Sequence, residues 1–443
     1  MVSQGAPLTP ARIAARPRNR RMPGGGFPLP AARRRKKHAP GRVAATGRPA
    51  MSIARERGLE AQRLIEAARS LSPAITGLRD DIQRERRLPA VLIEQLREHG
   101  FFSLFLPRRL GGLELSLTDY LQVVEEMSRV DGTVGWCVTI GGGAPPWLSG
   151  FLPEAAAHRI FVAERALVSG NLAPLGRAVP LPGGYRVSGR WAYGSGILHS
   201  AWIATGCVVM EDGVLRRALD GTVDTRILFL PTGEAEIIDT WHVGGLRGTG
   251  SHDYRMADVF VPASHALAPD QEPVQPGPLY TIPRHTVLGL TIAAVPLGIA
   301  RAALDAVREI TAGKTPRIRP ELLRDRPVVH ATLGRAEAQL RAARAFLLEA
   351  CEAAWSTAAG GGTVTLEQRV AVRLALAQAG EVSKSVVQAA YDIGGGTSIY
   401  DHCPLQRCFR DVHTASQHAQ VQSANFETAG RVLLGIEPGT PVL

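Results

Sequence analysis

The chain has 443 residues and is 45% hydrophobic, enough for a large buried core and for two or three domains. Its formal net charge of +11 would suggest a nucleic-acid or anionic-surface partner if the charge were evenly spread. Residues 1–50 hold 12 of the 51 Lys and Arg and no Asp or Glu, which leaves 39 basic against 40 acidic residues elsewhere, so composition excludes a globally basic domain and nucleic acid is not the expected partner.

The basic segment at residues 1–50 has no apolar periodicity, so we expect a disordered tail. Its densest cluster of charge is Arg33-Arg-Arg-Lys-Lys37. One interpretation is an arm that contacts nucleic acid or a membrane surface. The alternative is an upstream stretch included through a misplaced start, with the folded chain opening at Met51. The segment does not resemble a secretory signal, because no uninterrupted apolar core follows the charges.

Cysteine usage and apolar runs indicate the compartment. The cysteines are odd in number and scattered, at Cys137, Cys207, Cys351, Cys403 and Cys408, which predicts free thiols in a reducing cytoplasm. Cys403 and Cys408 lack the second pair of ligands that a structural zinc site needs, so we expect no metal site. No apolar run reaches the ~18 to 20 residues of a membrane span, so we predict no membrane segment.

The hydrophobic pattern changes twice along the chain. Residues 51–163 show helical spacing, as in the stripe of Leu59, Leu64 and Ile65. Residues 164–270 alternate with a period of two and are punctuated by Gly and Pro, which predicts hairpins that close into a barrel or sandwich. Residues 271–443 return to long Ala- and Leu-rich helices. The expected order is helices, then a β domain, then a helical bundle.

Three motifs in the predicted β domain carry small polar or aromatic side chains. Gly184-Tyr-Arg-Val-Ser-Gly-Arg-Trp-Ala-Tyr-Gly-Ser-Gly196 offers a flat aromatic and a hydroxyl, which suit a planar ring with a polar rim. A tight turn with a packed tryptophan is the alternative. Val168-Ser-Gly-Asn171 supplies a second small polar group. The glycine-rich stretch from Thr240 to Tyr254 either lets backbone approach a ligand or closes a hairpin.

The most informative motif lies near the C-terminus. The glycine triplet of Tyr391-Asp-Ile-Gly-Gly-Gly-Thr-Ser-Ile-Tyr400 precedes Arg410-Asp-Val-His-Thr-Ala-Ser-Gln-His418. Together with the order of elements, these motifs resemble the acyl-CoA dehydrogenase superfamily. Its common members place a catalytic Glu after Arg-Asp, whereas this chain has His418-Ala419-Gln420, and Pro283 to Gly298, which spans an alternative position of the base, also lacks Glu. The exchange is similar to the flavin-dependent monooxygenase branch, of the 4-hydroxyphenylacetate 3-hydroxylase oxygenase type.

The resemblance covers about residues 55–438 and implies an α+β, acyl-CoA dehydrogenase-like fold. Its parts would be an N-terminal helical domain at 51–163, a central β-barrel at 164–270 and a C-terminal four-helix bundle at 271–443. In the flavin site, the resemblance implies that Trp191 lies against the ring and that Ser195 and Gly196 approach its reactive edge. Family members are tetramers, so Gly395 and Ser398, with Arg284 as a weaker candidate, are expected to reach the flavin of a neighbouring subunit.

The resemblance also implies catalytic and substrate-binding roles. His418 occupies the position beside the lost Glu, where an imidazole can take a proton from a phenol or hold an oxygen. Ser169 is the second catalytic candidate, with Asn171 beside it as a substrate contact. Trp136 is expected to form a wall of the substrate pocket or ordinary core. The branch usually has a histidine after its Gly-Trp motif, and Gly135 to Ala144 has none, which leaves the substrate side of the pocket open.

The sequence therefore predicts the oxygenase component of a two-component monooxygenase. It would use reduced FMN or FAD from a separate flavin reductase, with O2 as co-substrate, to hydroxylate a phenolic or polycyclic aromatic compound. Relatives that oxidise nitrogen or sulfur keep an N- or S-oxidising activity open. An acyl-CoA dehydrogenase with a non-standard base also stays open, as does a non-catalytic flavin-fold binding protein whose basic tail contacts nucleic acid.

Overall fold

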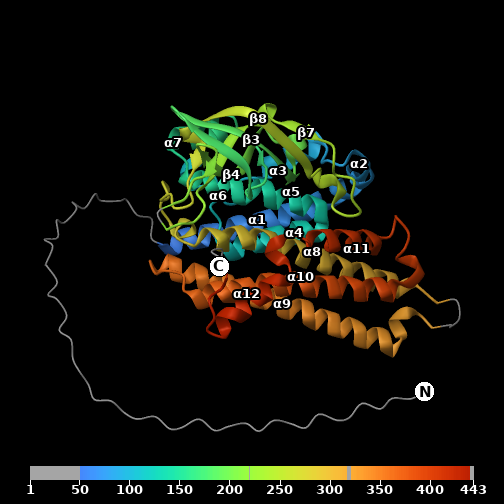
Figure 1. Ribbon diagram of the computed structural model, residues 1–443. Helices are drawn as coiled ribbons and strands as arrows, with labels where there is room; N and C mark the ends of the chain where they lie inside the picture. The colour runs from blue at the N-terminus through green and yellow to red at the C-terminus, as the bar shows by residue number, and fades with distance from the viewer. Residues whose placement is uncertain (1–49, 219, 317–320, 440–443) are drawn as a thin grey trace, which may run out of the picture. The chain divides into compact units, whose positions relative to one another are not determined.

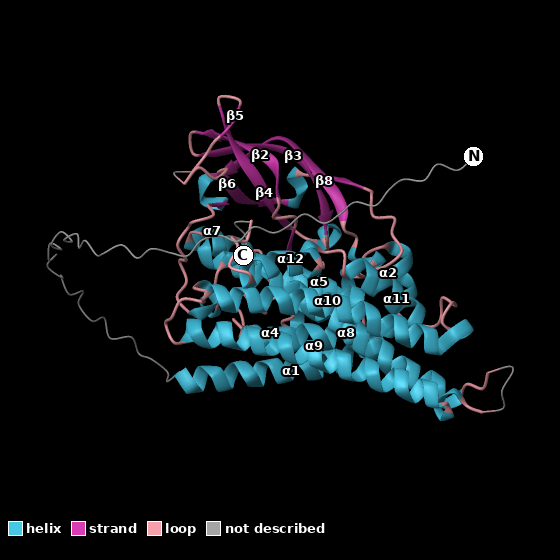
Figure 2. Ribbon diagram, turned by 60° about the horizontal axis from the view of Figure 1, so that its bottom comes forward, coloured by secondary structure: helices cyan, strands magenta, loops and turns pink. Residues whose placement is uncertain are grey.

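The structure is a computed structural model that describes residues 50–218, 220–316 and 321–439. The predicted disordered tail lies outside these residues, apart from Ala50. Pro49–Leu443 forms one compact unit, in which the strands gather on one side and the long helices on the other (Figures 1 and 2). The helices before the sheet are α1 Ala50–Gly77, α2 Arg79–Glu85, α3 Ala90–His99, α4 Leu117–Val130, α5 Gly132–Gly142, α6 Ala144–Leu148 and α7 Glu154–His158.

Two consecutive helices, α4 and α5, show how local sequence fixes the helical core. The side chain of Ser116 caps α4 by accepting from Asp119 N, and α4 buries a stripe that includes Tyr120, Val124 and Met127. Asp131 ends α4 and begins α5, because its carboxylate accepts from the N–H groups of Thr133 and Val134. Helix α5 is buried along nearly its whole length. This sharp α4–α5 connection places α5 beneath the sheet (Figure 1).

Within the described residues the central sheet is mixed and contains nine strands: β1 Val168–Ser169, β2 Pro174–Leu181, β3 Gly184–Gly194, β4 Trp202–Glu211, β5 Val214–Leu215, β6 Thr225–Pro231, β7 Glu236–Ile238, β8 His252–Pro262 and β9 Ala266–Leu267. Paired neighbours run in the order β7-β8-β3-β2-β4-β6-β9, with β1 and β5 also pairing with β4. The family resemblance implies a closed barrel. Among the described residues the path of pairing does not close, because β7 and β9 each pair with a single neighbour.

The helices after the sheet are α8 Arg284–Gly313, α9 Pro327–Ala359, α10 Leu366–Gly394, α11 Pro404–Ala415 and α12 Ala424–Leu433. Helix α8 packs against α4, α10 and α11, and α9 packs on α10 (Figure 1). Contrary to the expectation from apolar runs, an 18-residue window of α8 is apolar and long enough to cross a membrane. Since 83% of that window is buried inside the protein, α8 has the character of a core helix.

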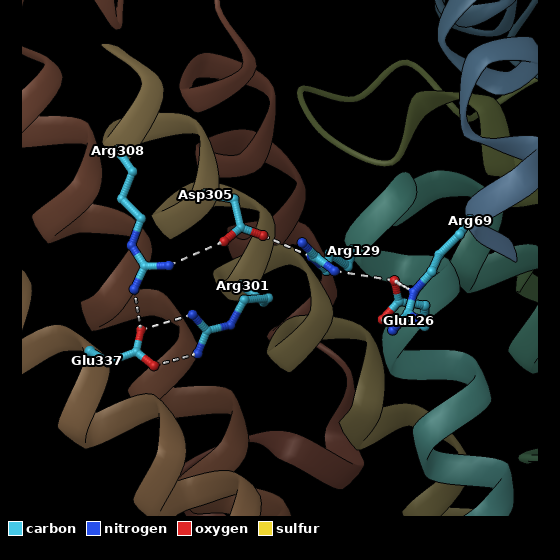
Figure 3. A network of polar contacts seen from close by, with 7 residues as sticks. All are labelled: Arg69, Glu126, Arg129, Arg301, Asp305, Arg308 and Glu337. Atoms are coloured by element: carbon cyan, nitrogen blue, oxygen red, sulfur yellow. Dashed lines mark hydrogen bonds and ion pairs between the residues drawn. The ribbon is translucent and has the colours of Figure 1, made fainter. Parts of the chain in front are cut away.

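Ion pairs connect four helices across the bundle. Figure 3 shows Arg129 of α4 between Glu126 and Asp305, with Nε of Arg129 at 2.7 Å from Oδ2 of Asp305 on α8. The same network continues to Arg69 of α1 and to Arg301, Arg308 and Glu337. Single exposed pairs contribute little to stability, but a network of several charges can fix how packed helices are aligned. These contacts therefore hold α1, α4, α8 and α9 together away from the sheet.

Candidate active site

A line of hydrogen-bonded side chains joins α5 to the sheet. Ser195 directly follows β3, and its Oγ accepts from Nε1 of Trp136 at 3.0 Å. Ser195 Oγ lies 2.7 Å from Ser251 Oγ, just before β8, and Ser251 Oγ lies 2.7 Å from Thr249 Oγ1. Thr249 donates in turn to the carbonyl of Leu246 at 2.9 Å. All three hydroxyl residues are buried, so the line is shielded from competing water.

The direction of this hydroxyl line follows from counting hydrogens. Each hydroxyl has one hydrogen to donate and two lone pairs to accept with. Because Thr249 donates to Leu246 O, Ser251 donates to Thr249 and Ser195 donates to Ser251. The indole of Trp136 is only a donor, so it occupies one lone pair of Ser195. Ser195 therefore retains one lone pair, and it presents an acceptor to an N–H or O–H group of a ligand.

Gly196 fixes the turn that carries Ser195. Its φ is +75°, in the left-handed region, and its N–H donates to the carbonyl of Thr249 at 2.7 Å. A Cβ added here would lie 3.0 Å from Nε2 of His199, so both conformation and space favour glycine. The predicted role of Gly196 in the flavin site stays a prediction. Its structural role is to lock the end of β3 to the glycine-rich loop.

His418 lies after α11, with its ring in an edge contact with Trp136 at 5.8 Å between ring centroids. Its Nδ1 accepts from Gln420 N at 3.3 Å, so in the neutral ring the hydrogen is on Nε2. Burial lowers the pKa of His418 to about 4. At neutral pH this residue is therefore an uncharged hydrogen-bond donor, which suits holding an oxygen atom better than removing a proton.

Trp191 is placed differently from the expectation. Its ring is fully buried in the core of the sheet, stacked on Tyr254 at 5.4 Å, and its Nε1 donates to the carbonyl of Gly206 at 2.7 Å. Gly176 also lies directly against it, since a Cβ there would come within 1.9 Å of the indole. No face of the ring is free for a flavin. We therefore correct the predicted contact: Trp191 supports the sheet from within, and the site begins at Ser195.

Ser169 and Asn171 differ in whether their side chains have hydrogen-bond partners among the described residues. Both ends of the Asn171 amide make a local hydrogen bond: Nδ2 donates to Ala192 O at 2.8 Å, and Oδ1 accepts from Ala173 N at 2.9 Å. That arrangement holds its own loop and does not favour the predicted substrate contact. The hydroxyl of Ser169 is buried and has no hydrogen-bond partner among the described residues. Buried polar groups are rarely left unpaired, so Ser169 retains the capacity to meet a ligand.

The three residues expected to reach a neighbouring flavin lie apart from this line. Arg284 stacks on Phe151 at 4.8 Å and donates to Ala268 O at 3.0 Å, and burial lowers its pKa. Ser398 is buried and donates to Tyr391 O at 2.8 Å, so its hydroxyl closes the turn after α10. Gly395 is exposed with φ +53°, and no Cβ at Gly395 would meet backbone. Of these three residues, Gly395 is the one that is exposed on the surface.

The structure thus brings three predicted residues together, Trp136, Ser195 and His418, and adds two. Thr249 and Ser251 belong to the glycine-rich stretch, for which the sequence assigned no definite contact. The sequence signal that identifies them is their spacing: two hydroxyl residues, two apart, directly before a strand that pairs with β3. Thr249 ends a 3-10 turn and Gly250 has φ +52°, so a tight turn brings the hydroxyls of Thr249 and Ser251 within 2.7 Å of each other.

Comparison with known proteins agrees with this geometry. Residues 60–150 match the family model of the acyl-CoA dehydrogenase N-terminal domain, and residues 290–423 match that of the C-terminal domain. The chain is 31% identical over 369 residues to an indole-3-acetate monooxygenase of Pseudomonas putida, covering 82% of this chain and 93% of the relative. It is 29% identical over 392 residues to the flavin-dependent monooxygenase oxygenase subunit HsaA of Mycobacterium tuberculosis, covering 86% and 97%.

A solved structure extends the likeness to the whole fold. XiaF from Streptomyces sp., solved in complex with FADH2 and glycerol, superposes with a TM-score of 0.81 at 26% identity, covering 88% of this chain and 100% of that one. The helix-sheet-helix order, the two family models and the full-length monooxygenase relatives agree with one another. The chain therefore belongs to the acyl-CoA dehydrogenase superfamily, in its flavin-dependent monooxygenase branch, and is an oxidoreductase.

Proposed function

We propose that this protein is the oxygenase component of a two-component monooxygenase that hydroxylates a phenolic or polycyclic aromatic substrate with O2. The observation that carries the proposal is the convergence of Trp136, Ser195 and His418 at one place between α5, the sheet and the end of α11. The relatives named as an oxygenase subunit and as a monooxygenase support the same class. A separate reductase would supply reduced FMN or FAD.

The residues at this place fit a reduced flavin. Ser195 offers a lone pair to an N–H donor, and a reduced isoalloxazine carries such a hydrogen at its reactive edge, where an oxidised ring has an acceptor. Ser169 has an unused buried hydroxyl that needs a partner. When bound, the reduced flavin supplies the electrons that activate O2.

His418 then acts as a donor from its Nε2–H. A neutral imidazole can hold an oxygen of the substrate or of the activated dioxygen without a charge that would have to be buried. The edge contact with Trp136 fixes the plane of the ring. The partners that the structure gives to His418, Trp136 and Ser195 include no carboxylate, which disfavours removal of a substrate α-proton as in an acyl-CoA dehydrogenase.

The test is anaerobic binding of chemically reduced FAD or FMN, followed by stopped-flow mixing with oxygenated buffer and a panel of phenolic and bicyclic aromatic compounds. We expect protein to delay the return of the oxidised flavin spectrum and a substrate from the panel to yield hydroxylated product. Immediate reoxidation to hydrogen peroxide, with no product from any compound, would refute the proposal.

A variant separates binding from chemistry. His418→Ala should bind reduced flavin as the wild type does and release more hydrogen peroxide per product, because it lacks the Nε2–H donor. His413→Ala is the matched control, since His413 packs on Phe409 at 4.6 Å, on α11 itself. An unchanged product yield in His418→Ala would remove the assigned role.

A further inference from the structure

The glycine-rich loop at residues 244–250 holds a strained backbone. Leu246 has φ +51°, a conformation that costs a residue with a side chain about 1 to 2 kcal/mol. Its carbonyl accepts from three donors: Thr249 Oγ1 at 2.9 Å, Thr249 N at 3.1 Å and Trp241 Nε1 at 3.1 Å. One of these, Thr249 Oγ1, ends the hydroxyl line that begins at Trp136. The position of Leu246 therefore sets where Thr249, Ser251 and Ser195 lie.

Helix α11 holds this loop from the other side. Oδ1 of Asp411 accepts from Leu246 N at 2.6 Å, and Nη1 of Arg410 donates to Gly244 O at 2.6 Å. Between these two bonds, a Cβ on Gly245 would come within 2.1 Å of Arg410 O. Backbone lies directly on backbone here. The Arg-Asp motif thus clamps the loop through both of its side chains.

The surroundings of the buried Asp411 side chain disfavour its charged form. It is 3% exposed and shares its surroundings with Asp131, Arg407 and Arg410, and burial followed by repulsion from Asp131 raises its pKa to about 6. A hydrogen bond from backbone N–H to a carboxylate is among the stronger ones in proteins. The bond to Leu246 N is the one short hydrogen bond that the described residues give to this carboxylate.

We propose that Asp411 is a positioning residue for the flavin reaction: by holding Leu246 in its left-handed conformation, it fixes the hydroxyl line that orients Ser195 beside Trp136. This inference rests on the proposed function. The same helix leads into His418, so α11 sets both the acceptor at Ser195 and the donor at His418. Asp411 acts through the loop, by way of its hydrogen bond with Leu246 N, and is not itself a contact of the substrate or the flavin.

The test compares Asp411→Ala with Asp411→Asn, which keeps an oxygen acceptor for Leu246 N. Asp305→Ala is the matched control, because Asp305 lines the same cavity of about 490 Å³ as Asp411 but pairs with Arg129, away from the loop (Figure 3). Each protein is titrated anaerobically with reduced FAD, and amide exchange is followed across residues 244–251. We expect Asp411→Ala to weaken reduced-FAD binding about tenfold and to speed exchange at Leu246 about tenfold, with Asp411→Asn and Asp305→Ala near wild type.

A second pair of variants tests the same inference in case Asp411→Ala does not fold. Gly245→Ala must push the loop off Arg410 O and should reproduce both effects, whereas Gly244→Ala meets nothing within 4 Å and should have neither. Wild-type reduced-FAD affinity in both Asp411→Ala and Gly245→Ala, or equal loss in Asp305→Ala, would overturn the inference. If wild-type protein binds no reduced flavin, the proposed function fails, and the exchange at Leu246 still decides whether Asp411 holds the loop.

Discussion

The protonation state of His418 gives the sharpest prediction from this structure. Its pKa lies at about 4, compared with 6.5 for a free imidazole. Since one pKa unit corresponds to about 1.4 kcal/mol, protonating His418 in the folded protein costs roughly 3.5 kcal/mol more than in water. The physical cause is burial of the ring, which none of the described carboxylates offsets. We therefore expect His418 to stay neutral, with hydrogen on Nε2, throughout pH 5 to 8.

The assay is a pH titration of protein labelled with carbon-13 at histidine Cε1, observed by NMR. His418→Asn identifies the signal by its loss, and Asn keeps an oxygen near the position of Nδ1 to accept from Gln420 N. The His418 signal should not move between pH 5 and 8. A midpoint near 6.5 for His418 would refute the reasoning, because it would mean that burial does not disfavour the charged ring.

Three further outcomes follow from the geometry. Gly196→Ala should lower the free energy of unfolding by about 1 to 2 kcal/mol, because φ is +75°, and a melting temperature equal to wild type would contradict this. Ser169→Ala should change stability by less than about 1 kcal/mol in urea denaturation, since its buried hydroxyl has no partner among the described residues, and yet weaken reduced-flavin or substrate binding; unchanged binding would remove Ser169 from the site. The pKa of Asp411 is raised to about 6, so the folded protein binds this proton more tightly than the unfolded chain, and the stabilisation is complete below about pH 4 and lost as pH rises through 6. In urea denaturation, the free energy of unfolding of Asp411→Asn should therefore rise relative to that of the wild type by up to roughly 3 kcal/mol between pH 4 and 7. A difference between the two proteins that does not change with pH would contradict the raised pKa.

Local patterns in the sequence account for the order of elements. The change from helical spacing to alternation and back depends only on which neighbours along the chain share a face. It can therefore be recognised from the sequence without knowledge of the fold. Motifs also made Ser195 and His418 candidates for the site, because each lies at a fixed distance from a glycine turn or an Arg-Asp pair. The sequence did not reveal that the order of paired strands is open, because strand pairing joins residues that are far apart in the sequence.

Trp191 shows where a sequence motif was not enough. Val187 and Trp191 are four residues apart on β3 and face the same side, the buried interior of the sheet. The motif predicted a ligand contact, but the alternation of the strand put the ring in the core. The buried window of α8 is a similar case, because its length and composition alone fit a membrane span.

The sequence by itself determined the helix-sheet-helix order, the family likeness and the replacement of a carboxylate by His418, because these depend on residue type and spacing along the chain. Only the tertiary structure decided that His418 is a neutral donor, that Ser195 is an acceptor and that Asp411 holds the loop behind it. Each of these properties is set by burial and by hydrogen-bond partners from distant segments: Trp136, Ser195 and Leu246 are brought to one place only when α5, the sheet and α11 pack together.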